Sequence, residues 1–387
     1  MTMLVRKGQT ATRLVIRALR RRLIPLARWS GGRRPRVLML SDAEGATLQY
    51  RVLNQAEQLR MAGIDVCCCD QHYIRLFALL DSCDLLYFYR LDDTPRTRHI
   101  LDVARTRGLT IVCDTDDLTW DERIVEDCQM ERYYTPPEIT RFRTQFRRSD
   151  AFLRNADLFV ASTEYLAGLL REHFERPAFV NQNAISPHMV ALSEPFFARR
   201  MAAPDRAPLT IAYFSGWPKA HEIDIDTMVP GLRRALEELP DARLLIVGHF
   251  DTTMLPVDLQ RRVERRPFVP YHDLFAAIAE ADINLAPLVD NPHRRSKSAV
   301  KFLEAALVGV PTVASDLEPY RLIQHGQTGM LTMNAQDWYA GIMALATDAA
   351  RRVAIGRAAH EYVLREHTSV VRAAGFAKIV DSMIEQQ

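Results

Sequence analysis

The sequence lacks an apolar run long enough to cross a membrane, and its first residues lack the uninterrupted apolar core of a secretory signal. We therefore expect neither a membrane-spanning nor a secreted protein. No cysteine pair stands in a C-x-x-C arrangement with histidine partners, which argues against a zinc site. No G-x-G-x-x-G follows the first predicted strand, which argues against a dinucleotide dehydrogenase.

Cysteine is sparse, and three of the six are consecutive: Cys67, Cys68, Cys69, Cys83, Cys113 and Cys128. Consecutive residues of a strand point to alternate faces, so the triplet suits buried thiols better than disulfides or a metal site. Free thiols are typical of a reducing compartment. The sequence therefore predicts a cytoplasmic protein.

Acidic residues are absent from residues 1–36, which hold eleven of the 50 Lys and Arg residues of the chain. The rest of the chain is net acidic, so the basic character belongs to this leader alone. Residues 12–24 place aliphatic side chains on one helical face and arginines largely on the other. An anionic membrane surface, at the inner face of the membrane, is therefore an expected partner of residues 1–30, and a plain docking or disordered leader is the alternative. We expect no nucleic acid partner, because aromatic residues are not interleaved with these bases.

At 387 residues the chain is longer than one hydrophobic core usually supports. Buried strands alternate with amphipathic helices in both halves, which predicts an α/β fold of two doubly wound, Rossmann-like parallel sheets facing across a cleft. A proline-rich stretch separates the halves. We expect a leader at 1–34, a first domain at 35–186, a linker at 187–208, a second domain at 209–370, and a C-terminal helix at 371–387 that packs back on the first domain.

The clearest pattern is SKSAVKFLEAALVGVPTVAS, residues 296–315. Apolar residues at helical spacing predict a buried helix, from which Lys301 and Glu304 project on one face. Gly309 is expected to end this helix, and residues 312–314 to form a buried parallel strand.

Three polar residues precede this predicted helix: Ser296, Lys297 and Ser298. The first backbone N–H groups of a helix are unpaired and its macrodipole is positive there, so a phosphate would be favoured beside these side chains. The simpler interpretation is a core helix with a solvated lysine.

The run KFLEAALVGVPTVAS, then HGQTG at 325–329 and the helical RRVAIGRAAHEYV, resembles the C-terminal half of family-four retaining glycosyltransferases of the GT-B fold. The resemblance covers residues 209–365. It implies that residues 209–370 bind a nucleotide sugar and that residues 35–186 form the acceptor-side domain. It further implies transfer of the sugar, with retention and without a metal or other cofactor, to a glycan or lipid-linked acceptor of bacterial surface polysaccharide synthesis.

In that family, two glutamates separated by seven residues contact the donor, the second through its ribose. Glu304 stands at the second position, whereas Ser296 stands at the first, so the chain departs from the pattern. The resemblance implies catalytic roles for Glu304 and Lys297. It places Ser296, Ser298 and Lys301 with Glu304 in the donor site.

Other positions resemble the family more weakly. The loop SGWPKAHEID resembles the glycine loop that carries cations toward the donor diphosphate, which implies donor contacts from Gly216, Lys219 and His221. In the first half, EGATLQYR resembles a glycine loop that faces the donor, through Gly45. Arg90 takes the place of a catalytic histidine of many relatives.

Four aspartates follow a predicted strand in DTDDLTWDE: Asp114, Asp116, Asp117 and Asp121. As an Asp-x-Asp motif they would offer hard oxygen ligands to a divalent cation. We expect instead that they cap the following turn, as carboxylates at strand ends commonly do. The resemblance also argues against a metal here.

Two alternatives stay open. A sugar-nucleotide epimerase can share the GT-B architecture, but it needs acid and base residues in the cleft. A non-catalytic GT-B subunit that binds a nucleotide sugar or a glycan is supported by Ser296 in place of the usual glutamate.

Overall fold

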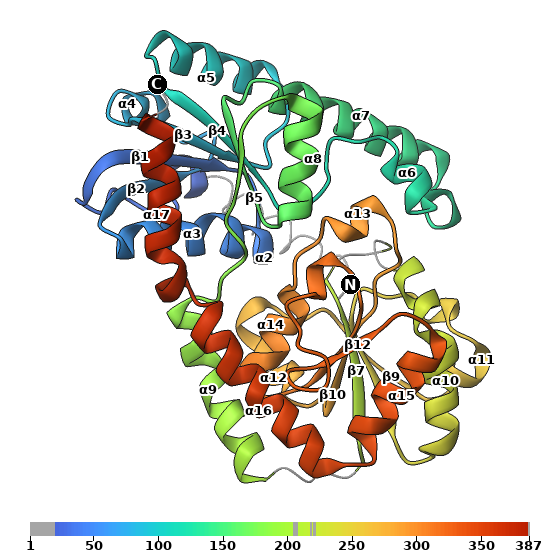
Figure 1. Cartoon of the computed structure of the whole chain (residues 1–387). Helices are drawn as coiled ribbons and strands as arrows, with labels where there is room; N and C mark the ends of the chain where they lie inside the picture. Colours follow the sequence, from blue (N-terminus) through green and yellow to red (C-terminus); the bar gives the residue numbers. More distant parts are fainter. Residues whose placement is uncertain (1–19, 204–207, 217–218, 220–221, 386–387) are drawn as a thin grey trace, which may run out of the picture. The chain divides into compact units, whose positions relative to one another are not determined.

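The computed structural model describes residues 20–203, 208–216, 219 and 222–385 (Figure 1). His221 and most of the basic helix expected at 12–24 lie outside these residues. The chain divides into two compact units. The first unit holds the described parts of 1–115, 144–181 and 372–387, and the second unit those of 116–143 and 182–371. Within the described residues, no helix is both long and apolar enough to span a bilayer.

Six parallel strands form the sheet of the first unit, in the order β2-β1-β3-β4-β5-β6. They are β1 (Arg33–Ser41), β2 (Ile64–Cys69), β3 (Leu85–Tyr89), β4 (Thr110–Thr115), β5 (Leu158–Ala161) and β6 (Ala178–Val180). Every residue of β2 to β5 is buried, because helices cover both faces of the sheet (Figure 1). The cysteines are free and buried, as the sequence predicted.

The last helix of the chain completes the core of the first unit. The helices here are α2 (Gly45–Leu48), α3 (Asn54–Met61), α4 (Leu76–Leu80), α5 (Pro95–Thr106), α8 (Glu164–Phe174), most of α7 (Pro136–Leu153) and α17 (Ser369–Glu385), with the π-helix η1 (Gln49–Leu53). Phe376 and Val380 of α17 are buried against the same cluster as Val37 and Tyr87 of the sheet. The rings of Tyr87 and Phe376 meet edge-on, with centroids 6.5 Å apart.

The second unit has its own parallel sheet, in the order β12-β11-β10-β7-β8-β9. Its strands are β7 (Thr210–Ser215), β8 (Arg243–Gly248), β9 (Val263–Arg266), β10 (Ile283–Ala286), β11 (Thr312–Ser315) and β12 (Met330–Thr332). The chain leaves β7 on one side for β8 and β9, then returns to β10 on the other side. In doubly wound sheets, ligands bind outside the carboxyl ends of the strands at such a switch point.

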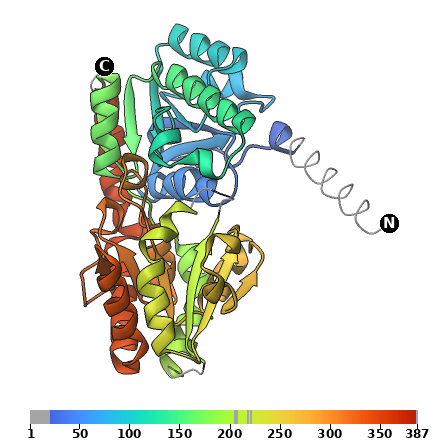
Figure 2. The same ribbon diagram turned by 90° about the vertical axis from the view of Figure 1, so that its right-hand side faces the viewer.

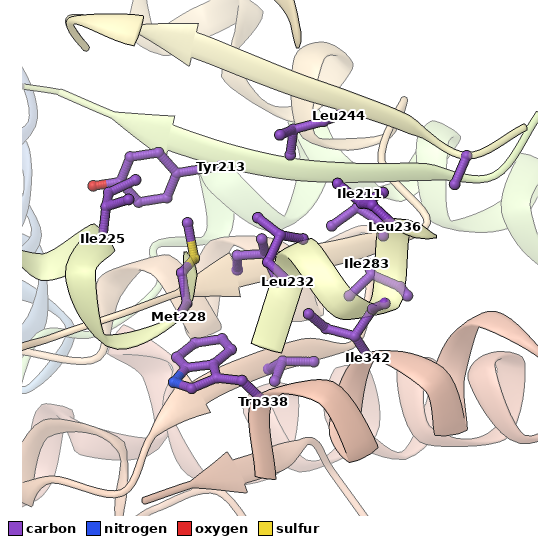
Figure 3. Close-up of a cluster of buried hydrophobic side chains, with 14 of the residues drawn as sticks. Ile211, Tyr213, Ile225, Met228, Leu232, Leu236, Leu244, Ile283, Trp338 and Ile342 are labelled. Carbon is purple, nitrogen blue, oxygen red and sulfur yellow. The ribbon is translucent and has the colours of Figure 1, made fainter. Parts of the chain in front are cut away.

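Helices on both faces of this sheet bury its core. The helices of this unit are α6 (Ile124–Asp127), α9 (Pro187–Ala202), α10 (Val229–Glu238), α11 (Val257–Gln260), α12 (Leu274–Ile278), α13 (Pro292–Arg295), α14 (Val300–Leu307), α15 (Ala335–Ala346) and α16 (Ala349–Glu366). The 3₁₀ turns are η2 (Met130–Arg132), η3 (Ile223–Thr227), η4 (Thr252–Met254), η5 (Tyr271–Asp273) and η6 (Glu318–Tyr320). Figure 3 shows Leu232 of α10 and Trp338 of α15 packed with Ile211 and Ile283 of the strands.

The end of α14 confirms the pattern seen in the sequence. The helix stops at Leu307, and Gly309 adopts φ +68°. Gly309 N donates to Ala306 O and Val310 N to Ala305 O, which is the Schellman arrangement. The buried strand β11 follows at once.

The expected linker at 187–208 was wrong for most of its length, because residues 187–202 form α9. Ser186 caps this helix, accepting from Met189 N at 3.2 Å, and Pro187 is its first residue. Proline is favoured at that position, so Ser-Pro indicates a helix start as well as a linker. The short edge strands β6, β9 and β12 were also not expected.

The contact between α16 and the end of α14 should depend on Gly356. A Cβ added there would overlap the carbonyl oxygen of Gly309, which is backbone and cannot rotate away. We expect Gly356→Ala to lower the free energy of unfolding by about 1–3 kcal/mol. In the control Gly375→Ala, on α17, the new methyl meets no atom within 4 Å and helix propensity should favour it. Urea denaturation measures both, and equal midpoints would contradict this packing.

Candidate functional site

The candidate site lies in the second unit, where the loops after β7 and β10 leave the switch point. The first loop carries Gly216 and Lys219, both exposed, and leads into η3. The second carries α13 and leads into α14. Most of the residues that the sequence analysis assigned to the donor therefore come from two adjacent loops at one sheet edge.

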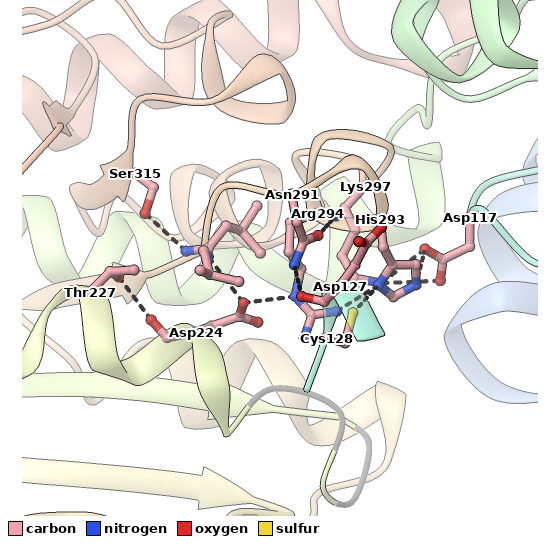
Figure 4. Close-up of polar contacts among 12 residues, drawn as sticks. Asp117, Asp127, Cys128, Asp224, Thr227, Asn291, His293, Arg294, Lys297 and Ser315 are labelled. Carbon is pink, nitrogen blue, oxygen red and sulfur yellow. Dashed lines mark hydrogen bonds and ion pairs between the residues drawn. The ribbon is translucent and has the colours of Figure 1, made fainter. Parts of the chain in front are cut away.

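A buried ion pair joins these two loops. Arg294 Nε of α13 donates to Asp224 Oδ1 of η3 at 2.7 Å, and the side chains are 2% and 0% exposed (Figure 4). Val289 N donates to the same oxygen at 3.1 Å. Burial alone would lower the pKa of Arg294, but the Asp224 carboxylate outweighs it and the pKa is raised. Both groups are therefore charged, and each depends on the other.

His293 extends this pair toward the surface. Its Nδ1 lies 2.7 Å from Arg294 Nη1, which can only donate, so Nδ1 accepts and the ring proton sits on Nε2. Nε2 lies 3.3 Å from Asp117 Oδ1. Burial, and then the charge of Lys297, lower the pKa of His293 to about 4. Because an unfolded histidine titrates near 6.5, this site favours unfolding progressively more as the pH falls from about 6.5 to 4.

Lys297 is held by the same aspartate. Its Nζ lies 2.9 and 3.1 Å from the two carboxylate oxygens of Asp117, and both side chains are about one-fifth exposed. Asp117 belongs to residues 116–143, which we call the crossing segment because they lead from strand β4 into the first part of helix α7 and pack within the second unit. Asn291 Nδ2 also binds this segment, at Asp127 O (2.9 Å).

Lys219 meets the crossing segment as well. Its Nζ is 3.6 Å from Glu138 Oε1 and lies 5.1 Å from the ring centre of Tyr134. Its backbone has φ +59°, a left-handed conformation that strains a residue with a side chain. The two lysines that the sequence assigned to a diphosphate thus each face a carboxylate of one segment.

Lys301 and Glu304 lie one turn apart on α14, as predicted. The Lys301 Nζ is buried, lies 4.3 Å from the ring centre of Tyr213, and makes no hydrogen bond within the described part of the chain. Burial lowers its pKa to about 8, so an appreciable fraction is neutral near neutral pH. Glu304 is 8% exposed.

Residues 208–348 match the family model described as Glycosyl transferases group 1. This segment is a group 1 glycosyltransferase domain. The chain carries a glycosyltransferase domain, and its two doubly wound sheets are those of the GT-B fold, as the sequence predicted. No curated protein sequence matches the chain.

Solved structures share this fold at low sequence identity. Sucrose-phosphate synthase from Thermosynechococcus elongatus is 14% identical, with TM-score 0.59 over 92% of this chain and 100% of that one. Alr3699/HepE of Anabaena, solved with UDP-glucose, is 16% identical, with TM-score 0.56 over 90% and 99%. WaaG, a glycosyltransferase of lipopolysaccharide biosynthesis, is 12% identical, with TM-score 0.57 over 89% and 99%.

In this glycosyltransferase, the three polar residues before α14 do not stand at a helix start as expected. The helix begins only at Val300, after Ala299. Ser296 is fully buried and its hydroxyl donates to Pro292 O at 2.8 Å, while Ser298 Oγ accepts from Asn183 Nδ2 at 2.8 Å. Both serine hydroxyls are thus engaged in hydrogen bonds, and Lys297 is the charged residue of the three.

The first unit of the glycosyltransferase holds the other two predicted residues. Gly45 opens α2 after β1 with φ +61° and is exposed. Arg90 follows β3, is exposed, and has φ +50°, with its guanidinium 5.7 Å from the ring centre of Tyr89. Both lie at the carboxyl edge of the first sheet.

The aspartates at the end of β4 and in the loop after it cap a turn only in part. Asp121 accepts from Arg123 N at 3.0 Å, as expected of a cap. Asp114 instead forms a buried ion pair with Arg51 (2.6 Å) and accepts from Tyr87 OH (2.9 Å). Asp117 pairs with Lys297, as described above. Capping was the wrong expectation for Asp114 and Asp117, because their partners are distant in sequence.

Removing the charge of Asp224 should leave a buried guanidinium without its partner. We expect Asp224→Asn to lower the free energy of unfolding by about 3–5 kcal/mol, the usual cost of breaking a buried pair. The control Asp290→Asn removes an exposed partner of Arg295 in the loop after β10 and should cost less than about 1 kcal/mol. Equal shifts in urea denaturation would show that the buried pair does not hold the loops.

Proposed function

We propose that this glycosyltransferase moves a sugar from a nucleotide-sugar donor to a surface-polysaccharide or lipid-linked glycan acceptor, with retention and without a metal ion or other cofactor. The observation that carries the proposal is that Lys219 and Lys297 stand on the loops after β7 and β10, the two strands that flank the switch point of a group 1 domain. The UDP-glucose complex of a protein with this fold supports a nucleotide-sugar donor.

The chemical demand is to stabilise a nucleoside diphosphate as it leaves. Cations placed in advance at the leaving group lower the barrier because they need not reorganise. Lys297 and Lys219 would supply these charges, with the exposed backbone of Gly216 allowing close approach. Lys301, on the buried side of α14, would hold its charge more firmly once an anion is nearby.

Glu304 would bind the ribose hydroxyls of the donor, the role that the family resemblance implies. Gly45 would face the donor and Arg90 would take the place of the catalytic histidine, the roles that the family resemblance implies. An acceptor attached to lipid would bring the reaction to the inner face of a bacterial membrane, and residues 1–30 would provide a basic contact with it.

A non-catalytic subunit that binds a nucleotide sugar is the second candidate. The observation that favours it is Ser296, because the position of the donor-sugar glutamate holds a fully buried serine whose hydroxyl is bonded to Pro292 O. Tight donor binding without turnover over a panel of acceptors would support this candidate.

Release of nucleoside diphosphate tests the proposal. Loss of the Glu304 hydrogen bond to ribose should lower kcat/KM of Glu304→Ala by about 10- to 100-fold, as for a charge-assisted hydrogen bond. The control Glu361→Ala removes an exposed carboxylate on α16 and should leave turnover unchanged. Equal turnover in wild type and Glu304→Ala would refute the ribose role.

The carboxylates of the crossing segment should compete with the donor for its two lysines. Asp117 and Glu138 partly neutralise Lys297 and Lys219. The double variant Asp117→Asn/Glu138→Gln should therefore bind a nucleoside diphosphate about 5-fold more tightly, the size expected of partly exposed ion pairs. Isothermal titration calorimetry with UDP measures this effect.

The matched control for that experiment removes the same number of negative charges from the crossing segment. Asp121→Asn/Glu126→Gln removes two carboxylates that pair with Arg123 and Arg143 and face neither lysine. Its affinity should equal that of the wild type. Weaker binding by the Asp117/Glu138 variant would mean that these carboxylates position the lysines.

A further inference from the structure

Two segments of the first unit form a surface that the transfer reaction does not use. Leu23, Ile24 and Ile74 are 62%, 47% and 71% exposed, and the two segments that carry them are in contact. Residues 20–24 and 72–75 meet through a hydrogen bond from Ile74 N to Arg22 O (2.8 Å). We call this surface the docking patch. It also includes three exposed arginines, which are Arg20, Arg22 and Arg75.

The docking patch is anchored to the first sheet. Arg21 turns inward, and its guanidinium donates to Asp42 O at 3.2 Å and to Ala43 O at 2.7 Å. A few residues later, Ala27 and Cys68 exchange backbone hydrogen bonds of 3.0 and 2.8 Å. The exposed residues on either side of Arg21 are therefore held beside the carboxyl ends of β1 and β2, where the blue start of the described chain lies in Figure 2.

The docking patch is positively charged because the nearby acidic side chains are largely engaged by other residues of the first unit. Asp42 accepts from the Gln71 amide, and Asp70 accepts from His72 N at 2.8 Å and lies 3.7 Å from Arg21. Glu44, at the border of the patch, is the nearby acid that stays half-exposed. Aliphatic tips beside arginines match the two layers of an anionic bilayer surface, its acyl boundary and its phosphates.

We propose that the docking patch seats the first unit on an anionic lipid bilayer. The inference extends the proposed membrane contact of residues 1–30 and rests on it, but adds a second contact from the folded domain at 72–75. Three partly inserted aliphatic side chains, together with the attraction of the basic residues to an anionic surface, are enough for reversible binding. The carboxyl edge of the first sheet would then face the membrane that holds a lipid-linked acceptor.

Vesicle sedimentation of the full chain tests the docking patch. Vesicles of phosphatidylglycerol and phosphatidylcholine should bind the wild type, and vesicles of phosphatidylcholine alone should bind it at least 10-fold more weakly. Leu23→Ser/Ile24→Ser/Ile74→Ser should weaken binding to the anionic vesicles about 10-fold. The control Val257→Ser/Phe268→Ser/Met333→Ser removes equally exposed apolar groups from the second unit and should bind as the wild type does.

Each other outcome overturns a distinct part of the inference. If deletion of residues 1–19 abolishes binding but the patch variant binds normally, the leader alone is the membrane contact. If the wild type does not bind anionic vesicles, both membrane proposals fail. Nucleoside diphosphate release with a soluble acceptor should be unchanged in the patch variant. That release also shows that the variant is folded, and it separates this test from the test of the transferase itself.

Discussion

The buried pair of Asp224 and Arg294 is the constraint on which the loops of the second unit depend. Because both side chains are buried from water, each charge is stable only while it is paired with the other. The pair therefore fixes the loops after β7 and β10 relative to one another. Through His293, this order reaches Asp117 and then Lys297. A fully buried interaction thereby sets the position of a partly exposed lysine at the switch point.

The electrostatic balance around this pair explains why the lysines can act on an anion. The charge of Arg294 is balanced by the carboxylate of Asp224. Lys301 is partly neutral because burial lowers its pKa. Lys297 and Lys219 pair with carboxylates that are at least one-fifth exposed. Partly exposed ion pairs are weak, so a diphosphate that carries more charge can exchange with them at small cost.

Much of the fold could be predicted from the sequence, because its signals are local. The helix at 300–307, the glycine after it and the strand at 312–315 were read from spacing and from the conformational preference of glycine. The edge strand β9, with the sequence VERR, could not be, because its charged side chains have no apolar period. Helix α9 was mistaken for a linker, because its prolines indicate both a helix start and a loop.

The site was predicted less completely, for a different reason. Sequence spacing showed that Lys301 and Glu304 share a helix face, but it could not show that Asp117 and Lys297, 180 residues apart, form an ion pair. Such a contact depends on the path of the crossing segment, which leaves the first sheet after β4 and packs within the second unit. From the sequence, these aspartates were interpreted as turn caps or as a metal motif, because both interpretations consider only residues that are close in sequence. Carboxylates at a strand end are therefore better judged by which cations distant in sequence they can reach, and here Asp114 reaches Arg51 and Asp117 reaches Lys297.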